Sequence, residues 1–221
     1  MKTLIKNTMR AEAIVGLLCI IATSTFAYIP YYKPFPAQGK FVLFKDMVSI
    51  LQYFESQRGN FSADIDIVLK AYHECFFTDD VPRSTGLRRP FVAIEGKNRL
   101  LRETVARMLA DKLGARYLSV PPKCMWSLIH VFKKKSLLRN AFFALSLYPA
   151  AFNARQLLSI GTPVVINGYW TEQAAYVIDK MYQRTRDLPR KGSWIYDYPR
   201  DLMVPDLLFY LNEMDNRVNS P

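Results

Sequence analysis

The stretch 89–104 constrains the fold more than any other part of the chain, because a strand pattern, a glycine and a helical pattern follow one another there. Phe91-Val-Ala-Ile94 is a short apolar run, typical of the middle of a parallel sheet. After Gly96, apolar residues recur at helical spacing and predict the buried face of a helix: Leu101, Val105, Met108, Leu109 and Leu113. A strand, a glycine turn and a helix form the unit with which nucleotide-binding folds hold phosphate.

The residues after Gly96 depart from the loop that binds phosphate in such folds. That loop reads Gly-x-x-x-x-Gly-Lys-Ser/Thr, where the lysine contacts phosphate and the hydroxyl binds magnesium. Counted from Gly96, the second glycine is Leu101, the lysine is Arg102 and the hydroxyl is Glu103. Leu101 lacks glycine's freedom at positive φ, and the carboxylate of Glu103 repels phosphate. The candidate phosphate-loop residues are Glu95, Gly96, Lys97, Asn98, Arg99, Leu100, Leu101, Arg102, Glu103 and Thr104.

Strand-like and helical segments alternate through the rest of the chain. Strands are expected at 115–120, 164–166 and 205–211, and helices at 124–132, 137–159 and 171–186. This alternation predicts an α/β fold, with a parallel sheet flanked by helices and right-handed crossovers. Two amphipathic stretches, at 41–57 and 65–77, predict a helical extension before it. The expected organisation is a linker and helical extension at 28–89 and an α/β domain at 90–221.

Residues 1–27 are interpreted as a targeting segment. Lys2, Lys6 and Arg10 precede the apolar run Ala13–Ala22, and small residues follow up to Ala27. A secretory signal has this layout. A mitochondrial presequence is also compatible with the basic, acid-poor start, and residues 11–27 are an alternative membrane anchor, although the run is short for a full span.

Composition narrows the partners and the chemistry. With 50% hydrophobic residues the chain has ample material for a packed core, and its net charge of +11 suits acidic lipid or nucleotide phosphates. Direct nucleic-acid binding is not expected, and Lys133-Lys-Lys135 is interpreted as a solvated loop. The three cysteines, Cys19, Cys75 and Cys124, are too few and too far apart to predict a disulfide framework. With only two histidines, no metal centre made of protein ligands is expected.

Between Pro90 and Leu211 the chain resembles the thymidylate kinase family, and within it the mitochondrial UMP/CMP kinases. The motifs that carry the resemblance are Phe91-Val-Ala-Ile-Glu-Gly96, Pro121-Pro-Lys-Cys124, Leu138-Arg-Asn-Ala-Phe142, Pro163-Val-Val-Ile-Asn-Gly-Tyr-Trp170 and the segment 202–210. The resemblance implies a P-loop NTPase-like sheet with strand order 2-3-1-4-5 and a mitochondrial location. It also implies ATP and Mg²⁺ as cofactors if activity is present; otherwise no cofactor is expected.

The chain departs from this family at the residues that serve the reaction. The family's loop, Glu-Gly-Leu-Asp-Gly/Ala-Ser/Thr-Gly-Lys-Thr-Thr, is matched only at Glu95, Gly96 and Thr104. The family's Asp-Arg-Tyr becomes Asn167, Gly168 and Tyr169, so only the tyrosine remains. Arg139 matches an arginine that lies near the monophosphate, which makes Arg139 and Tyr169 the candidate substrate contacts. The family's lid, fifth strand and last helix are expected to be missing, because the sequence stops at Pro221.

Three functional hypotheses follow. The first is a catalytically inactive thymidylate kinase-like protein that serves as a nucleotide-binding or interaction module. The second is an active nucleoside monophosphate kinase that phosphorylates dTMP, CMP or UMP with ATP and uses Arg102 to bind phosphate. The third is a decayed fragment. With no fifth strand expected, segment 207–211 becomes a sheet edge, which predicts a homodimer or a protein partner there.

Overall fold

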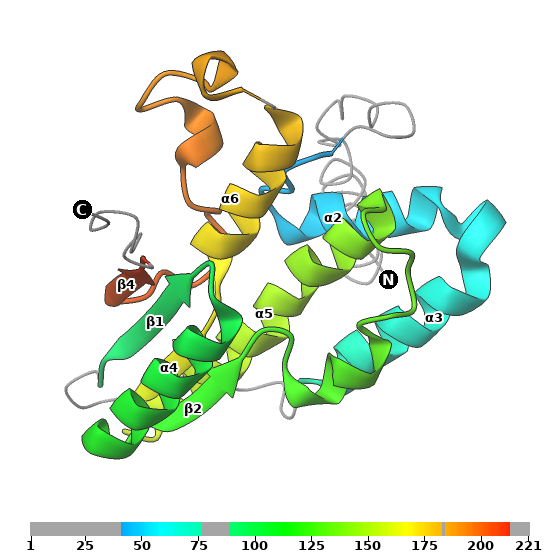
Figure 1. Ribbon diagram of the computed structural model, residues 1–221. Helices are drawn as coiled ribbons and strands as arrows, with labels where there is room; N and C mark the ends of the chain where they lie inside the picture. The colour runs from blue at the N-terminus through cyan, green and yellow to red at the C-terminus, as the bar shows by residue number, and fades with distance from the viewer. Residues whose placement is uncertain (1–40, 77–88, 183, 213–221) are drawn as a thin grey trace, which may run out of the picture. The chain divides into compact units, whose positions relative to one another are not determined.

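The computed structural model describes residues 41–76, 89–182 and 184–212 (Figure 1). The predicted targeting segment and most of the predicted linker lie outside these residues. The elements are the α-helices α2 (Met47–Ser56), α3 (Arg58–Glu74), α4 (Arg99–Leu113), α5 (Leu137–Ser159) and α6 (Trp170–Met181), the strands β1 (Phe91–Gly96), β2 (Arg116–Ser119), β3 (Val164–Asn167) and β4 (Leu207–Leu211), and the 3₁₀ helices η1 (Lys123–Leu128), η2 (Thr185–Asp187) and η3 (Trp194–Tyr196).

The four strands form one parallel sheet in the order β2-β3-β1-β4, which confirms the predicted α/β fold. Phe91 lies opposite Val164 of β3, and Gly96 lies opposite Leu211 of β4. Every residue of β1 and β3 is buried, because helices cover both faces of these two central strands. The architecture is that of a P-loop NTPase-like α/β fold.

Alternate residues of β1 point to different helices. Phe91 and Ala93 pack with residues of α5 and α6, whereas Val92 and Ile94 pack with α4. Figure 1 shows α4 and α5 on opposite sides of the sheet. Two helices precede the sheet in the amphipathic stretches, although α3 begins at Arg58 rather than at 65, and both helices contact α5. Because α5 lies between the sheet and this helical extension, its buried residues are distributed around the helix rather than along one face.

The predicted buried face of α4 is correct only at Val105 and Leu109, which pack against the core. Leu101, Met108 and Leu113 are exposed, and the buried residues of this helix are Arg102, Ala106 and Ala110. Small side chains at i and i+4 let the helix axis lie close to the sheet, so the helix is turned by about one residue from the expected orientation. This rotation of the helix places Arg102 in the protein interior.

Three other predictions need correction. Segment 124–132 forms only the 3₁₀ helix η1 and turns, α6 ends at Met181 rather than at 186, and β4 begins at Leu207. By contrast, the predicted helix 137–159 has the bounds of α5, which begins after Ser136. The Ser136 hydroxyl accepts a hydrogen bond from the Arg139 backbone N–H at 3.1 Å, so a side-chain cap fixes this end of α5.

Two cysteines form a disulfide, although their number and spacing did not predict a disulfide framework. Cys75, after α3, is bonded to Cys124 in η1, with 5.8 Å between their Cα atoms. The two residues are 49 positions apart in sequence. They meet because α3 packs against η1, a contact that their separation along the chain does not reveal. The bond fastens the helical extension to the segment after β2.

Among the described residues, no helix has both the length and the apolar content needed to cross a membrane. In the same part of the chain, no group of three or more His, Cys, Asp or Glu side chains is arranged to hold a metal ion.

Candidate functional site

The connection between β1 and α4 is too short to form the expected phosphate loop. Only Lys97 and Asn98 separate the last residue of β1 from the first residue of α4. The Asn98 Oδ1 accepts a hydrogen bond from the Leu101 backbone N–H at 3.1 Å and so caps the helix. Arg99, Leu100 and Leu101, which the sequence placed in the loop, therefore lie in the first turn of α4. The Asn98 side chain already occupies one of the N–H groups that would face a phosphate.

Gly96 serves the sheet at this position. Its φ of +145° is a conformation that residues with side chains rarely adopt. A Cβ at Gly96 would lie 2.4 Å from the backbone oxygen of Leu211, its pairing partner on β4. The glycine is therefore required for the close approach of β1 and β4, whether or not a phosphate binds nearby.

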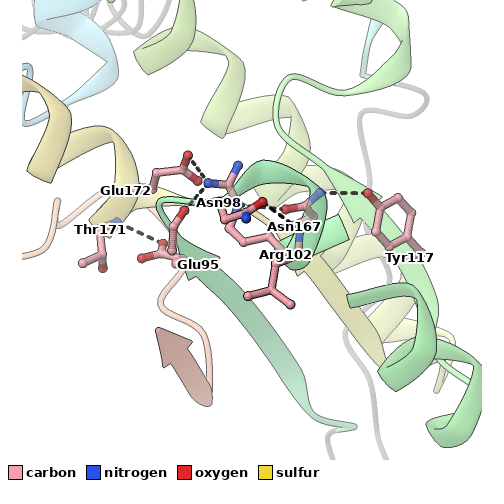
Figure 2. Close-up of polar contacts among 9 residues, drawn as sticks. Glu95, Asn98, Arg102, Tyr117, Asn167, Thr171 and Glu172 are labelled. Carbon is pink, nitrogen blue, oxygen red and sulfur yellow. Dashed lines mark hydrogen bonds and ion pairs between the residues drawn. The ribbon is translucent and has the colours of Figure 1, made fainter. Parts of the chain in front are cut away.

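Arg102 forms a buried polar cluster at the carboxyl ends of β1 and β3 (Figure 2). Its side chain donates to Gly96 O and to Glu172 Oε1, and its Nε donates to Asn167 Oδ1 at 3.2 Å. Asn167 Nδ2 in turn donates to the Tyr117 hydroxyl at 3.1 Å. Arg102 is only 8% exposed, and Glu172 balances its charge. The residue in the lysine position is thus held by protein groups.

Gly168, in the position of the family's arginine, has no room for a side chain. Its φ is +74°, in the left-handed region that favours glycine. A Cβ there would lie 2.7 Å from Glu172 Oε2 and 3.8 Å from an Arg102 nitrogen. A side chain at position 168 would therefore be strained by the positive φ and would require the Glu172 carboxylate to move.

Two other charged residues at the start of α4, Arg99 and Glu103, line the pocket together with this cluster, and Arg99 partly offsets the rise in the pKa of Glu172 that burial causes. Glu103 forms an ion pair of 2.8 Å with Arg107, one turn further along the helix. The Arg107 guanidinium lies 4.2 Å from the centre of the Tyr117 ring. Lys97 and Thr104 are exposed. Glu103, which stands where the resemblance implies a hydroxyl, is therefore already paired with Arg107.

Glu95 caps α6 from β1. Its Oε1 accepts a hydrogen bond from the Thr171 backbone N–H at 3.1 Å, whereas its Oε2 is buried and has no hydrogen-bond partner among the described residues. Burial, together with the nearby charge of Glu172, raises the pKa of Glu95 to about 7. Burial also raises the pKa of Glu172, and Arg102 counters that increase. The carboxylates of Glu95 and Glu172 lie close together, and the positive charge of Arg102 offsets their negative charge.

The raised pKa of Glu95 predicts a specific pH dependence of stability. Because its pKa lies near 4.5 in the unfolded chain and about 7 in the folded one, the folded state binds more protons between these values. Stability is then lost as the pH rises through this window, by up to about 3 kcal/mol. Glu95→Gln should remove this loss in urea unfolding at pH 5 and pH 8. The exposed Glu74→Gln is the control, and an equal pH dependence in all three proteins would contradict the assignment.

A pocket of about 860 Å³ opens beside the cluster. Its lining includes basic side chains, namely Arg99, His130, Lys134, Lys135 and Arg139. It also includes aromatic side chains, namely Phe41, Tyr117, Trp126, Phe143 and Tyr176. The sequence analysis interpreted Lys133-Lys-Lys135 as a solvated loop and missed its contribution to this pocket. All three lysines are exposed, but Lys134 and Lys135 also border the cavity.

The two candidate substrate contacts both line the pocket and both have structural partners. The Arg139 guanidinium donates to the backbone oxygens of Ile129 and Phe132, the latter at 3.3 Å, and so supports the pocket wall. Tyr169 is buried, and its hydroxyl donates to Met203 O at 2.8 Å. The structure therefore brings both residues to the same pocket as Asn167 and Gly168, while showing a packing role for each.

Comparison with known proteins gives one relationship. Over 121 residues the chain is 33% identical to the human protein named UMP-CMP kinase 2, mitochondrial, a match that covers 54% of this chain and 27% of that protein. The chain is related to a nucleoside monophosphate kinase. The match spans about a quarter of the relative's length, and it agrees with the kinase-like sheet described above. No protein-family model and no solved structure matches.

Proposed function

We propose that this protein is a catalytically inactive, thymidylate kinase-like domain that binds a nucleoside monophosphate in the 860 Å³ pocket. One observation carries the proposal: the ion pair of buried Arg102 and partly exposed Glu172 stands where the family binds phosphate, beside a pocket that stays open. Protein side chains occupy the place where a kinase binds the phosphates of its phosphoryl donor. The place for the phosphoryl acceptor stays open.

The inactivity follows from what phosphoryl transfer needs. The reaction depends on cations and a magnesium ion positioned around the transferred group. Arg102 is already neutralised by Glu172, and Asn167 supplies no charge in the place of the family's acid. Gly168 supplies no guanidinium. Nothing in this cluster is left to stabilise the charge of the transition state.

Nucleotide binding is supported by the chemistry of the pocket. Aromatic side chains offer flat surfaces against which a base can stack, and the basic side chains complement a phosphate. The ligand class is proposed from the name of the relative, which specifies UMP and CMP, and from the resemblance to thymidylate kinases, which adds dTMP.

Thermal unfolding with added nucleotides tests this function. UMP, CMP or dTMP should raise the melting temperature, because a ligand at about a hundred times its Kd stabilises a fold by roughly 2.7 kcal/mol. ATP with Mg²⁺ should give no comparable increase. The double variant Lys134→Ala/Lys135→Ala should weaken the effect of the monophosphate.

Lys123→Ala/Lys133→Ala removes the same charge from residues outside the pocket lining and is the matched control. Loss of stabilisation in both double variants would show a charge effect without a site. Absence of stabilisation by every monophosphate would refute the proposed function. A protein without a cooperative melt would instead support the hypothesis of a decayed fragment.

We further propose that β4 is a site of self-association. Its apolar residues Leu207–Tyr210 alternate between the two faces of the sheet, yet all are 40–53% exposed. In the described part of the chain, β1 is the only strand paired with β4, which leaves the other edge open. An open apolar edge favours pairing with another chain.

Light scattering at tens of micromolar should therefore find a dimer or a larger species. Phe209→Lys places a charge on the edge strand and should shift the protein toward the monomer. Leu100→Lys changes an apolar residue on α4 that is 75% exposed and should leave association unchanged. A monomeric parent protein would count against this proposal.

The proposed location is mitochondrial, and the name of the relative supports it. The alternatives proposed for residues 11–27, secretion or a membrane anchor, stay open. The Cys75–Cys124 disulfide adds a condition, because disulfides persist mainly in oxidising compartments. Whichever organelle receives the protein, the disulfide favours a location in an oxidising compartment of that organelle.

A further inference from the structure

The segment 184–200, which connects α6 to β4, is a basic and aromatic loop that contributes nothing to the 860 Å³ pocket. In Figure 1 it leaves the C-terminal end of α6 and returns beside that helix. We propose that this loop docks the protein on an anionic membrane surface.

The loop has a fixed conformation. Ile195 is buried in the main core, and the Lys45 ammonium donates to its backbone oxygen at 3.1 Å. The Tyr196 hydroxyl donates to Pro189 O at 2.8 Å, which joins the two halves of the loop. Successive 3₁₀ turns at η2 and η3 complete it. Since little chain entropy is lost on binding, the loop is suited to present side chains to a partner.

Next to the buried Ile195, the loop exposes large apolar side chains. Trp194 is 68% exposed, Tyr196 42% and Leu188 38%. Leu188 and Tyr196 also border a groove of about 480 Å³ against α6, where Ile178 and Tyr182 form part of the opposite wall. Tryptophan and tyrosine favour the membrane–water interface, because their rings are apolar with one polar group.

The charge of the loop is complementary to an acidic surface. Its basic side chains are all exposed: Arg184, Arg186, Arg190, Lys191 and Arg200. Its acids are Asp187 and Asp197, and Asp187 lies 3.4 Å from Arg184 and 3.9 Å from Arg186. Within the described residues, Arg190 and Lys191 form no ion pair, and the turn from Arg190 to Ser193 places them next to Trp194.

An anionic bilayer explains these features better than a nucleic acid does. Single-stranded nucleic acid is bound by aromatic side chains on which successive bases stack along a basic groove. Here the exposed ring is accompanied by an aliphatic side chain and an apolar groove, which suit the boundary between headgroups and acyl chains. The basic residues then contact the headgroups.

Vesicle flotation of the full chain tests the proposal. Vesicles of phosphatidylcholine with 30% phosphatidylserine should bind the protein more strongly than pure phosphatidylcholine, and added salt should weaken binding. Each basic residue near such a surface contributes about fivefold in affinity, so Arg190→Ala/Lys191→Ala should reduce binding roughly 25-fold. Trp194→Phe should remove the blue shift in tryptophan fluorescence that vesicles cause.

Lys112→Ala/Arg116→Ala removes the same charge from exposed residues at the far end of α4 and from β2, and serves as the control. The control should bind vesicles like the parent protein. Equal losses in the two double variants, or no preference for anionic vesicles, would refute a docking role for the loop. Binding of a single-stranded oligonucleotide with the same dependence on Arg190 and Lys191, but no vesicle binding, would assign the surface to nucleic acid instead.

Discussion

Replacement of Arg102 by methionine is expected to lower the free energy of unfolding by about 3 kcal/mol, the lower end of the usual effect of removing one partner of a buried ion pair, because the Glu172 side chain is still 36% exposed. The substitution leaves Glu172 without its cation, close to the buried carboxylate of Glu95. It also removes the hydrogen bonds that Arg102 donates to Gly96 and Asn167. Urea unfolding at pH 7 measures the loss.

The double variant Arg102→Met/Glu172→Met should recover most of that stability, because replacing both members of a buried pair by apolar residues is often nearly neutral. The control is Arg107→Met, which breaks the exposed ion pair with Glu103 and should have little effect. If Arg102→Met left stability unchanged but abolished nucleotide binding, Arg102 would be a phosphate-binding residue. The hypothesis of an active kinase would then gain support.

No magnesium-dependent phosphoryl transfer from ATP to dTMP, CMP or UMP is expected, and restoring the loop sequence should not create it. The test variant combines Arg99→Gly, Leu101→Gly, Arg102→Lys and Glu103→Thr. It supplies the glycines, the lysine and the hydroxyl of a phosphate loop. The lysine introduced at position 102 would still face Glu172, however, so its charge would stay with the protein.

The second half of the site explains why the loop alone is insufficient. Asn167 lacks the charge of the family's acid, and an arginine at 168 would be strained by the positive φ of this position. Loss of a single stabilising donor typically lowers a rate by a hundred- to a thousandfold. A coupled assay that found about one turnover per second, either in the parent protein or in the loop variant, would overturn the proposed inactivity.

The sequence predicted the sheet because its central strands are buried on both faces and therefore appear as short apolar runs. β1 and β3 were recognised in this way, and α5 was located through its long apolar stretch. The orientation of α4 was not predicted, because the usual rule assigns leucine to the interior and arginine to the surface. Here two alanines and an ion-paired arginine occupy the buried side.

The sequence analysis named the positions of the candidate site from separate motifs and missed their interactions. The positions 102, 167 and 168 do converge, as their places after neighbouring strands indicate. The partner that unites them, Glu172, lies on α6 and belongs to no motif, so only the folded arrangement reveals it. The pocket was missed for a similar reason, because its lining comes from separate segments that pattern analysis treats one at a time.

The bond between Cys75 and Cys124 closes a covalent ring that contains β1, α4 and β2. The N-terminal helices are consequently joined to the kinase-like domain twice, once by the peptide chain and once by the disulfide. A protease that cuts the chain anywhere between the two cysteines divides the polypeptide but releases neither part. In an oxidising compartment, α2 and α3 therefore remain covalently attached after such a cut, and reduction of this one bond leaves only their non-covalent packing to hold them.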